Sequence, residues 1–275
     1  MRAIIRPLVQ FPPTWFVLKF FYKVFNRFKF EKDLIKIEAD RAIMEAKEAP
    51  LRKAYSDLIV KDGPFKGMKY PDFVAFGSAM YPKLHGCYEA EINPELEKLL
   101  KNDYANIIDV GCAEGYYAVG LAMRKPNATV YAYDINEEAL AACKKMAILN
   151  KVDNHMRFET FCSPETLKSF DVSKRTLILC DCEGYEMELF TKEVVDNIKN
   201  CDVLVEMHDL YNEQISPTVE AAFASTHNAT VIYSQNTFKK LEKLGMRGNL
   251  TDEQVQKFFT ERNGIMNWVV FTPKV

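Results

Sequence analysis

The sequence predicts an α/β fold, a Rossmann-like αβα sandwich in which helices cover both faces of a mostly parallel sheet. Three observations predict it. Short β-rich runs alternate with helical stretches from about residue 94, two of these runs are apolar without alternation, and a glycine loop joins the first run to a helix. Strands that alternate with helices form parallel sheets with helices on both faces. The 275 residues, 48% of them hydrophobic, are enough to bury such a core.

The expected sheet has seven strands, because seven short runs are rich in β-branched and aromatic residues. They cover residues 106–110, 129–134, 156–161, 176–181, 202–208, 230–235 and 267–273. Helices are expected between most of them, at residues 95–100, 117–124, 137–150, 186–198, 217–224 and 252–262. The last of these helices begins with a capping box formed by Thr251 and Gln254. The apolar runs IIDV and LILC are typical of central parallel strands.

Residues 1–30 have a composition unlike the rest of the chain, with six basic residues, no acidic residue and nine aromatic residues. After two prolines, Thr14 is expected to cap an aromatic helix with a narrow polar stripe. Such a helix must bury most of its circumference. It packs on the protein's own body or on a second subunit, or it lies in a membrane interface. A second helix, over residues 31–48, is expected to end at Pro50.

We expect three parts along the chain: a helical N-terminal extension (1–59), a turn-rich entry or lid segment (60–93) and the main α/β domain (94–275).

The net charge and the cysteines limit the partners that the protein can have. A net charge of −2 gives no global attraction to nucleic acid. Seven scattered cysteines predict reduced thiols in a cytoplasmic protein without structural zinc. No secretory signal or bilayer-spanning apolar stretch is expected, so membrane contact would be peripheral, through residues 1–30.

The run IIDVGCAEGYYAVGLA, residues 107–122, is the strongest local signal of a ligand site. A buried strand carries Asp109 near its end, and a glycine loop then leads into an apolar helix. Glycines there allow the backbone to approach a ligand closely. The next strand ends at Asp134, where a carboxylate can accept both hydroxyl hydrogens of a ribose. This strand–turn–helix–strand pattern indicates an adenosine cofactor.

The loop sequence favours S-adenosylmethionine over a dinucleotide. It reads Gly111, Cys112, Ala113, Glu114 and Gly115. The middle glycine of the dinucleotide pattern is absent, and Glu114 places a carboxylate where a pyrophosphate needs positive potential. The ammonium and sulfonium groups of S-adenosylmethionine suit an acidic loop. A dinucleotide, or a fold that has lost its ligand, is the alternative, and Asp109 alternatively serves only to fix loop amides.

The remaining cofactor contacts are expected from positions after the second and third strands. The loop from Gly111 to Gly115 is expected to hold the methionine part, and Asp134 the ribose. Ile135 is placed against the adenine, and Cys162 and Ser163 at the edge of the ring.

Acidic side chains follow the fourth strand and indicate the reaction centre. Asp181, Glu183 and Glu186 lie where ligands bind in a doubly wound sheet, beyond the carboxyl ends of the strands. Mutual repulsion can raise one pKa and create a base, and the group could also hold a divalent cation. Alternatively, Glu183 and Glu186 only favour the dipole of the next helix.

The fifth strand, DVLVEMHD, brings Glu206, His208 and Asp209 to the same edge. Histidine is well suited to accept a hydroxyl proton near neutral pH, although histidines at strand ends are often only hydrogen-bonded. We assign the catalytic role to His208 and to the pair Asp181 and Glu183, and we assign no metal.

These motifs resemble the FkbM family of S-adenosylmethionine-dependent methyltransferases. The D-V-G-x-x-x-G-Y-Y loop (109–117) looks like its first motif, and the D-x-E-G-x-E stretch (181–186) like its most distinctive one. Glu206-x-His208 and the late Arg262 are also similar. The resemblance covers residues 60–275. It departs at Cys112 and Glu114, where many members have small or amide residues.

The resemblance implies more than the residues alone do. The segments at 63–71 and 83–91 look like the entry region of some members, which implies that Tyr88 and Glu89 border the cofactor site. The fold is then the class I methyltransferase sheet, with the C-terminal strand antiparallel. The implied reaction is O-methylation of a hydroxyl on a sugar or natural-product-like small molecule. The alternatives are a dinucleotide-dependent oxidoreductase and a non-catalytic, membrane-associated binding protein of the same fold.

Overall fold

The computed structural model describes residues 12–262, 264 and 266–274, without the side chains of residues 12–21 and 24. The chain forms two compact units, Met1–Ala54 and Tyr55–Val275. Residues 1–11 of the predicted N-terminal extension lie outside the described residues. The turn-rich segment belongs to the same unit as the sheet.

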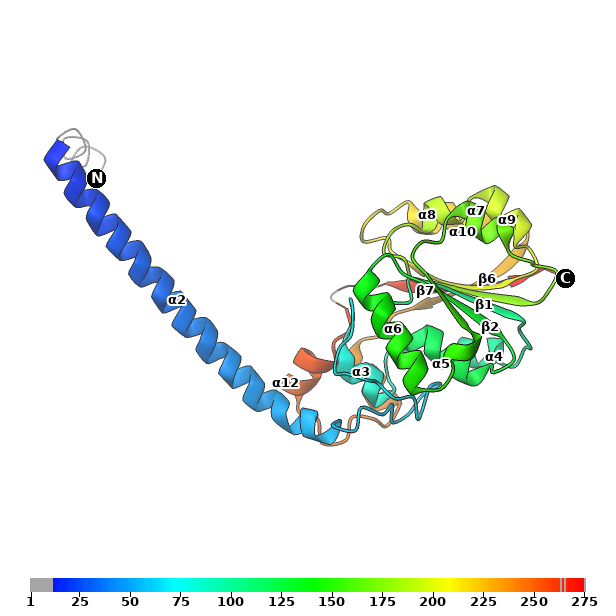
Figure 1. Ribbon diagram of the computed structural model, residues 1–275, viewed down its shortest axis with the longest axis horizontal. Coiled ribbons are helices and arrows are strands. Elements are labelled where there is room, and N and C mark those ends of the chain that lie inside the picture. The colour runs from blue at the N-terminus through cyan, green and yellow to red at the C-terminus, as the bar shows by residue number, and fades with distance from the viewer. Residues whose placement is uncertain (1–11, 263, 265, 275) are drawn as a thin grey trace. The chain divides into compact units, whose positions relative to one another are not determined.

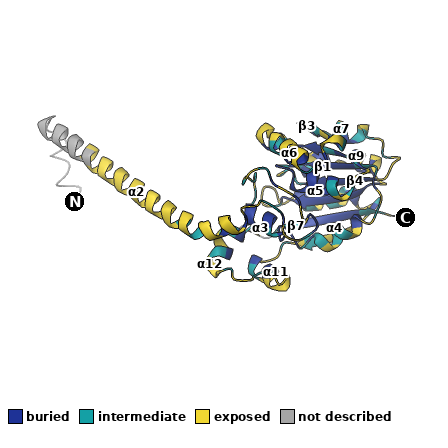
Figure 2. Ribbon diagram, turned by 60° about the horizontal axis from the view of Figure 1, so that its bottom comes forward, coloured by how far each residue is buried: buried dark blue, intermediate teal, exposed yellow. Residues whose placement is uncertain are grey.

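The described part of the first unit is one helix, α2 (Pro12–Ala54), of 43 residues (Figure 1). Two expectations are therefore wrong. Thr14 lies inside the helix because Pro12, with its fixed φ, suits the first helical position. Pro50 also lies inside, because strong helix formers precede it and the helix continues for only one more turn. The described side chains from residue 22 to residue 43 are exposed (Figure 2).

The second unit is built on a seven-stranded sheet with the order β3-β2-β1-β4-β5-β7-β6. The strands are β1 (Asn106–Val110), β2 (Thr129–Tyr133), β3 (Met156–Glu159), β4 (Thr176–Cys180), β5 (Asp202–Met207), β6 (His227–Tyr233) and β7 (Asn267–Pro273). β7 runs antiparallel to both β5 and β6, and the other pairs are parallel. This is the sheet of the class I methyltransferase fold, and it confirms the predicted fold class.

Helices cover both faces of this sheet (Figure 1). One face carries α4 (Asn93–Leu99), α5 (Tyr116–Arg124) and α6 (Glu137–Leu149). The other carries α7 (Pro164–Ser169), α8 (Glu186–Leu189), α9 (Lys192–Asn197) and α10 (Ile215–Phe223). Because both faces are covered, every residue of β4 and β5 is buried, which explains their non-alternating sequences. The core under α8–α10 includes Phe190 and Phe223.

The helices differ from the prediction where they are short or interrupted. The helix expected over 186–198 is two, because the Thr191 side chain caps α9 by accepting a hydrogen bond from the Val194 amide. The capping box at Thr251 and Gln254 is confirmed, but α12 (Asp252–Gln254) continues as the π-helix η2 (Val255–Phe259). Four short elements were not expected: α3 (Met80–His85), the 3₁₀ turn η1 (Asp153–His155), α7 and α11 (Thr237–Lys243). They have too few turns to show a helical period.

The turn-rich segment 60–93 is ordered and packs on the sheet unit. Its backbone forms a bridge between Ile59 and Lys69. The Asn150 side chain, after α6, bonds both the amide and the carbonyl of Lys69, at 2.9 and 2.7 Å. Phe65 and Met68 are fully buried. The role of this segment as an entry or lid stays a prediction.

Candidate active site

A cavity of about 860 Å³ opens at the carboxyl edge of the sheet. It is lined by residues that follow β1, β2, β3, β4 and β5, and by parts of the segments 76–88 and 261–266. β1 and β4 are neighbours here, with Val110 paired to Cys180, while the chain leaves them in opposite directions. Such a topological switch point is where doubly wound sheets bind ligands.

The loop after β1 is held by backbone hydrogen bonds from both sides. The amides of Gly111 and Cys112 donate to the Tyr133 carbonyl at the end of β2, at 2.8 and 2.9 Å, and the Asp181 amide donates to the Val110 carbonyl. Gly111 has a φ of +87°, and a Cβ there would lie 1.7 Å from the Asp181 carbonyl oxygen. Only glycine fits at this position, which keeps β1 and β4 close at the cavity floor.

Asp134 joins the loop to the beginning of α6. Its Oδ2 accepts a hydrogen bond from the Ala113 amide at 2.7 Å, and its Oδ1 accepts from the Asn136 amide at 2.8 Å. The N-cap of α6 is Asn136, whose side chain accepts hydrogen bonds from the Glu138 and Ala139 amides. Because a carboxylate has about four lone-pair sites, Asp134 keeps acceptor capacity on the cavity side.

The structure places the expected cofactor residues in two groups. Those that line the cavity are Tyr88, Gly111, Cys112, Ala113, Asp134, Ile135, Cys162 and Asp181. Those outside its lining are Glu89, Asp109, Glu114, Gly115 and Ser163.

Glu114 lies outside the cavity lining, contrary to the argument from an acidic loop. Its carboxylate forms a buried ion pair with Lys83 at 2.5 Å and accepts hydrogen bonds from the Tyr70 hydroxyl and the Phe76 amide. Lys83 therefore neutralises the charge that we expected to favour an ammonium group. Lys83 itself lines the cavity.

Glu89 and Asp109 are also fully buried and lie outside the cavity lining. Glu89 accepts a hydrogen bond from the Tyr117 hydroxyl and pairs with Arg262. The Asp109 carboxylate has no hydrogen-bond partner among the described residues. Burial and the nearby charge of Asp181 raise the pKa of Asp109 well above its usual range.

Gly115 and Ser163 have packing and capping roles. A Cβ at Gly115 would lie 2.8 Å from the Cys143 sulfur, so this glycine lets α5 approach α6. The Ser163 hydroxyl accepts a hydrogen bond from the Thr166 amide and caps α7.

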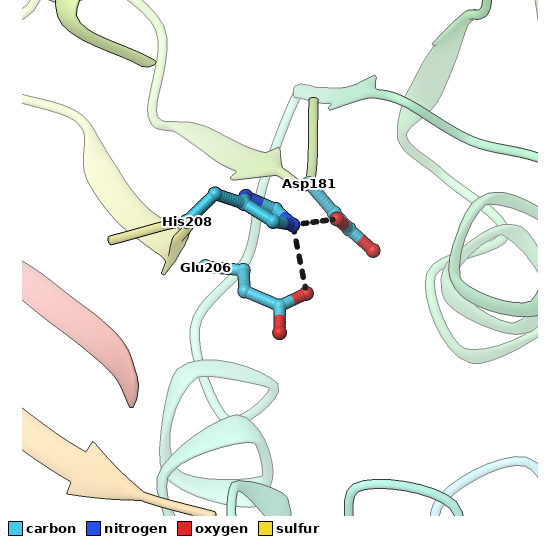
Figure 3. A group of neighbouring side chains, drawn as sticks. All are labelled: Asp181, Glu206 and His208. Atoms are coloured by element: carbon cyan, nitrogen blue, oxygen red, sulfur yellow. Dashed lines mark ion pairs between the residues drawn. The ribbon is translucent and has the colours of Figure 1, made fainter. Parts of the chain in front are cut away.

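A histidine–carboxylate cluster forms the other side of the cavity, at the ends of β4 and β5. Nδ1 of His208 lies 2.7 Å from Oε1 of Glu186, which is fully buried. Nε2 of His208 lies 3.4 Å from Oδ1 of Asp181, 3.4 Å from Oε2 of Glu183 and 3.8 Å from Oε2 of Glu206. Figure 3 shows Asp181 and Glu206 converging on this nitrogen. Thus all three expected catalytic residues meet at one point.

Burial and mutual charge shift the pKa values in this cluster. Burial raises the pKa of Asp181 to about 6, against the lowering effect of His208. For Glu186, burial is outweighed by the hydrogen bond from His208, which lowers its pKa. Burial would lower the pKa of His208, but the hydrogen bond to Glu186 and the charge of Asp181 raise it.

Several residues at the cavity were not in the predicted site. Arg262 pairs with both Glu206 and Glu89, and so joins β5 to the segment before α4. Tyr211 stacks on the His208 ring and donates a hydrogen bond to Glu183. In the sequence, only the family resemblance pointed to Arg262. Nothing in the sequence indicates that Lys83 pairs with Glu114.

The charges and surfaces of the cavity suit a cationic nucleoside without phosphates. Its basic side chains, Lys83 and Arg262, are each paired with buried carboxylates. The acidic side chains that line it are Asp134, Asp181, Glu183, Glu206 and Glu261. Ile135 and Phe161 offer exposed apolar surface to an aromatic ring. A sulfonium therefore fits this lining and a pyrophosphate does not.

Comparison with known families agrees with this chemistry. Residues 101–259, more than half of the chain, match the family described as "Methyltransferase domain". The chain belongs to this family, and residues 101–259 form an S-adenosylmethionine-dependent methyltransferase domain.

Individual proteins resemble the chain over a short stretch or at low sequence identity. A stretch of 99 residues, 36% of the chain, is 35% identical to the release factor glutamine methyltransferase of Flavobacterium psychrophilum. The chain spans about a third of the length of that relative, 32%. An O-methyltransferase from Bacillus cereus is 11% identical with a TM-score of 0.44, over 68% of this chain and 81% of its own. An rRNA methylase from Streptococcus thermophilus is 12% identical with a TM-score of 0.45, over 67% of this chain and 97% of its own.

Proposed function

We propose that the protein transfers the methyl group of S-adenosylmethionine to a hydroxyl oxygen of a sugar or natural-product-like small molecule. The observation that carries this proposal is the convergence of His208, Asp181 and Glu183 at the cavity edge. In such a transfer the acceptor oxygen bonds to the methyl carbon, the carbon–sulfur bond breaks, and S-adenosylhomocysteine leaves. The hydroxyl proton must be removed, and this cluster offers the groups to receive it.

The assignment to the FkbM family is part of this proposal. Its support is that the motif residues lie together in space: Asp181, Glu183 and Glu186 after β4 meet His208 at the end of β5. The family match itself is to a general methyltransferase domain. The name of the Flavobacterium relative points instead to a glutamine amide, which makes a peptide amide the acceptor to test against.

For the donor we propose a site between the loop after β1 and Asp134. Gly111, Cys112 and Ala113 would hold the methionine part, and Asp134 would accept hydrogen bonds from the ribose. Ile135 and Cys162 would border the adenine. The support is that all of these residues line one cavity next to the His208 cluster. Positioning of donor and acceptor supplies much of the rate of such a transfer.

The test is an acceptor screen with isotopically labelled S-adenosylmethionine. The panel holds free and lipid-linked saccharides, hydroxylated natural products, a glutamine peptide and RNA, and mass spectrometry locates the methyl group. We expect methylation on oxygen, and a loss of about 100-fold in Asp181→Asn. The matched control is Asp209→Asn, because Asp209 follows His208 but its carboxylate accepts hydrogen bonds from the Ser216 amide and hydroxyl. Transfer only to nitrogen or carbon, or full activity in Asp181→Asn, would contradict the proposal.

We also propose that residues 1–30 bind an anionic membrane surface. Tyr22, Phe25 and Phe28 are 66–68% exposed, and this segment has six basic residues and no acidic one. No helix in the described part of the chain combines the length and apolarity needed to cross a bilayer. Full-length protein should float with phosphatidylglycerol vesicles, and Phe25→Ser/Phe28→Ser should float less, with Ile37→Ser as control. Equal flotation, or a dimer that this double variant dissociates, would contradict lipid binding.

A further inference from the structure

We propose that Asp181, Glu206 and His208 bind a divalent transition-metal cation. The three side chains come from the ends of two neighbouring strands, β4 and β5. One ligand atom from each lies within 4.8 Å of the others (Figure 3). All three residues line the cavity, so a cation held by them has open positions toward an acceptor.

The tautomer of His208 is set by its buried partner. Nδ1 lies 2.7 Å from Oε1 of Glu186, whose side chain is 0% exposed. Nδ1 therefore carries a proton and donates it in a hydrogen bond, which directs Nε2 toward Asp181 and Glu206. A histidine held at one nitrogen by a carboxylate, with the other nitrogen free, is the usual arrangement of a metal-binding histidine.

The distances around Nε2 suit a cation better than a proton. Oδ1 of Asp181 and Oε2 of Glu206 lie 3.4 and 3.8 Å from Nε2. Hydrogen bonds from N–H to oxygen are about 2.7–3.2 Å long, and one proton on Nε2 can point to only one acceptor. Two ligand atoms that each lie about 2.1 Å from an ion, at a tetrahedral angle, are roughly 3.4 Å apart.

The charge of the cluster also calls for a cation. Oδ1 of Asp181 is buried and has no hydrogen-bond partner among the described residues. The Glu206 side chain is 3% exposed, and its Oε1 forms an ion pair with Arg262. Arg262 also forms an ion pair with Glu89. Burying charges without full neutralisation is energetically costly. A divalent ion at Nε2 would neutralise Asp181 and the part of the Glu206 charge that Arg262, shared with Glu89, does not balance.

The ligand set selects the kind of ion. Magnesium and calcium prefer oxygen ligands alone, whereas imidazole with carboxylates suits first-row transition metals. We therefore expect Mn²⁺ or Zn²⁺ rather than Mg²⁺. A cation here would hold an acceptor oxygen and make its hydroxyl more acidic. That use rests on the proposed function, but the binding of the ion does not.

The experiment measures Mn²⁺ binding without donor or acceptor. Chelator-treated, full-length protein is titrated with Mn²⁺, and the electron paramagnetic resonance signal reports the free ion. We expect one tightly bound ion per chain. Glu206→Gln and His208→Asn should weaken binding by at least about 100-fold, and Glu186→Gln by about 10- to 100-fold through the orientation of His208. Asp209→Asn, at the same strand end, should bind as the wild type does.

The titration separates this inference from the proposed function. Absence of a bound ion in the wild-type protein, or wild-type affinity in His208→Asn, would overturn the cation site. Because the titration measures ion binding and not methyl transfer, neither of these two results would contradict the proposed reaction. An ion that is lost in the Glu206 and His208 variants and kept in Asp209→Asn would support the site.

Discussion

The two sides of the cavity are built in different ways. On the β1–β2 side, the loop at Gly111 is fixed by backbone hydrogen bonds and by the two amide contacts of Asp134. On the β4–β5 side, the surface consists of charged side chains that converge on His208. The first side offers a shape into which a donor fits, and the second offers a concentration of negative charge. Substitutions should therefore act through close packing on one side and through charge on the other.

The largest effect should come from Gly111→Ala on the backbone-built side. The added Cβ meets the Asp181 carbonyl at 1.7 Å, so β1 and β4 must separate. We expect a loss of roughly 2–5 kcal/mol in the free energy of unfolding and no binding of S-adenosylhomocysteine. The control is Gly67→Ala, which has nearly the same φ, +89° against +87°, but nothing within 4 Å. It should lose about 1–2 kcal/mol. Equal losses in urea unfolding would show that the close contact is unimportant.

Glu114→Gln should come next, because it lowers stability by a similar amount but leaves donor binding intact. It leaves Lys83 buried without its 2.5 Å partner, and breaking such a pair costs about 3–5 kcal/mol. Lys83→Met/Glu114→Gln should recover much of this loss, because no unpaired charge remains. Thermal unfolding of the single and double variants measures the recovery. If the double variant were less stable than either single one, the pair would not be the cause.

Asp134→Asn should weaken the donor without unfolding the protein. An amide side chain retains one acceptor oxygen, so the loop contact to Ala113 can persist while charged hydrogen bonds to a ribose are lost. We expect the dissociation constant for S-adenosylhomocysteine to rise by about 10- to 100-fold. Isothermal calorimetry measures it. Unchanged affinity would remove Asp134 from the donor site.

Ser163→Ala should have the smallest effect and should separate capping from cofactor binding. The Ser163 hydroxyl accepts the Thr166 amide at the start of α7. Its loss should cost about 1 kcal/mol of stability and leave the affinity for S-adenosylhomocysteine unchanged. A drop in affinity with unchanged stability would return Ser163 to the cofactor site.

The sheet could be predicted from the sequence, because it depends on local patterns. The expected strands at 106–110 and 267–273 match β1 and β7, and the carboxylate at Asp134 lies where the spacing placed it. Pairs of distant residues could not be predicted. Glu114 pairs with Lys83 and Arg262 pairs with Glu89, across 31 and 173 positions. No local pattern records such a partner, so the sequence does not show that the Glu114 carboxylate is paired with Lys83.

The same limit explains the His208 cluster. The sequence placed acidic residues and a histidine at adjacent strand ends, and that much followed from the rule for parallel sheets. The sequence does not predict which ring nitrogen of His208 faces which carboxylate. It depends on Glu186, whose side chain turns back toward β5 instead of only facing the α8 dipole.

The central claim is that the crevice between Gly111 and Asp134 binds the methyl donor. A crystal structure of the protein with S-adenosylhomocysteine tests it most directly. We predict the nucleoside over the loop after β1, with both ribose hydroxyls within hydrogen-bond distance of the Asp134 carboxylate. A nucleoside bound elsewhere, or one whose ribose does not touch Asp134, would contradict the account.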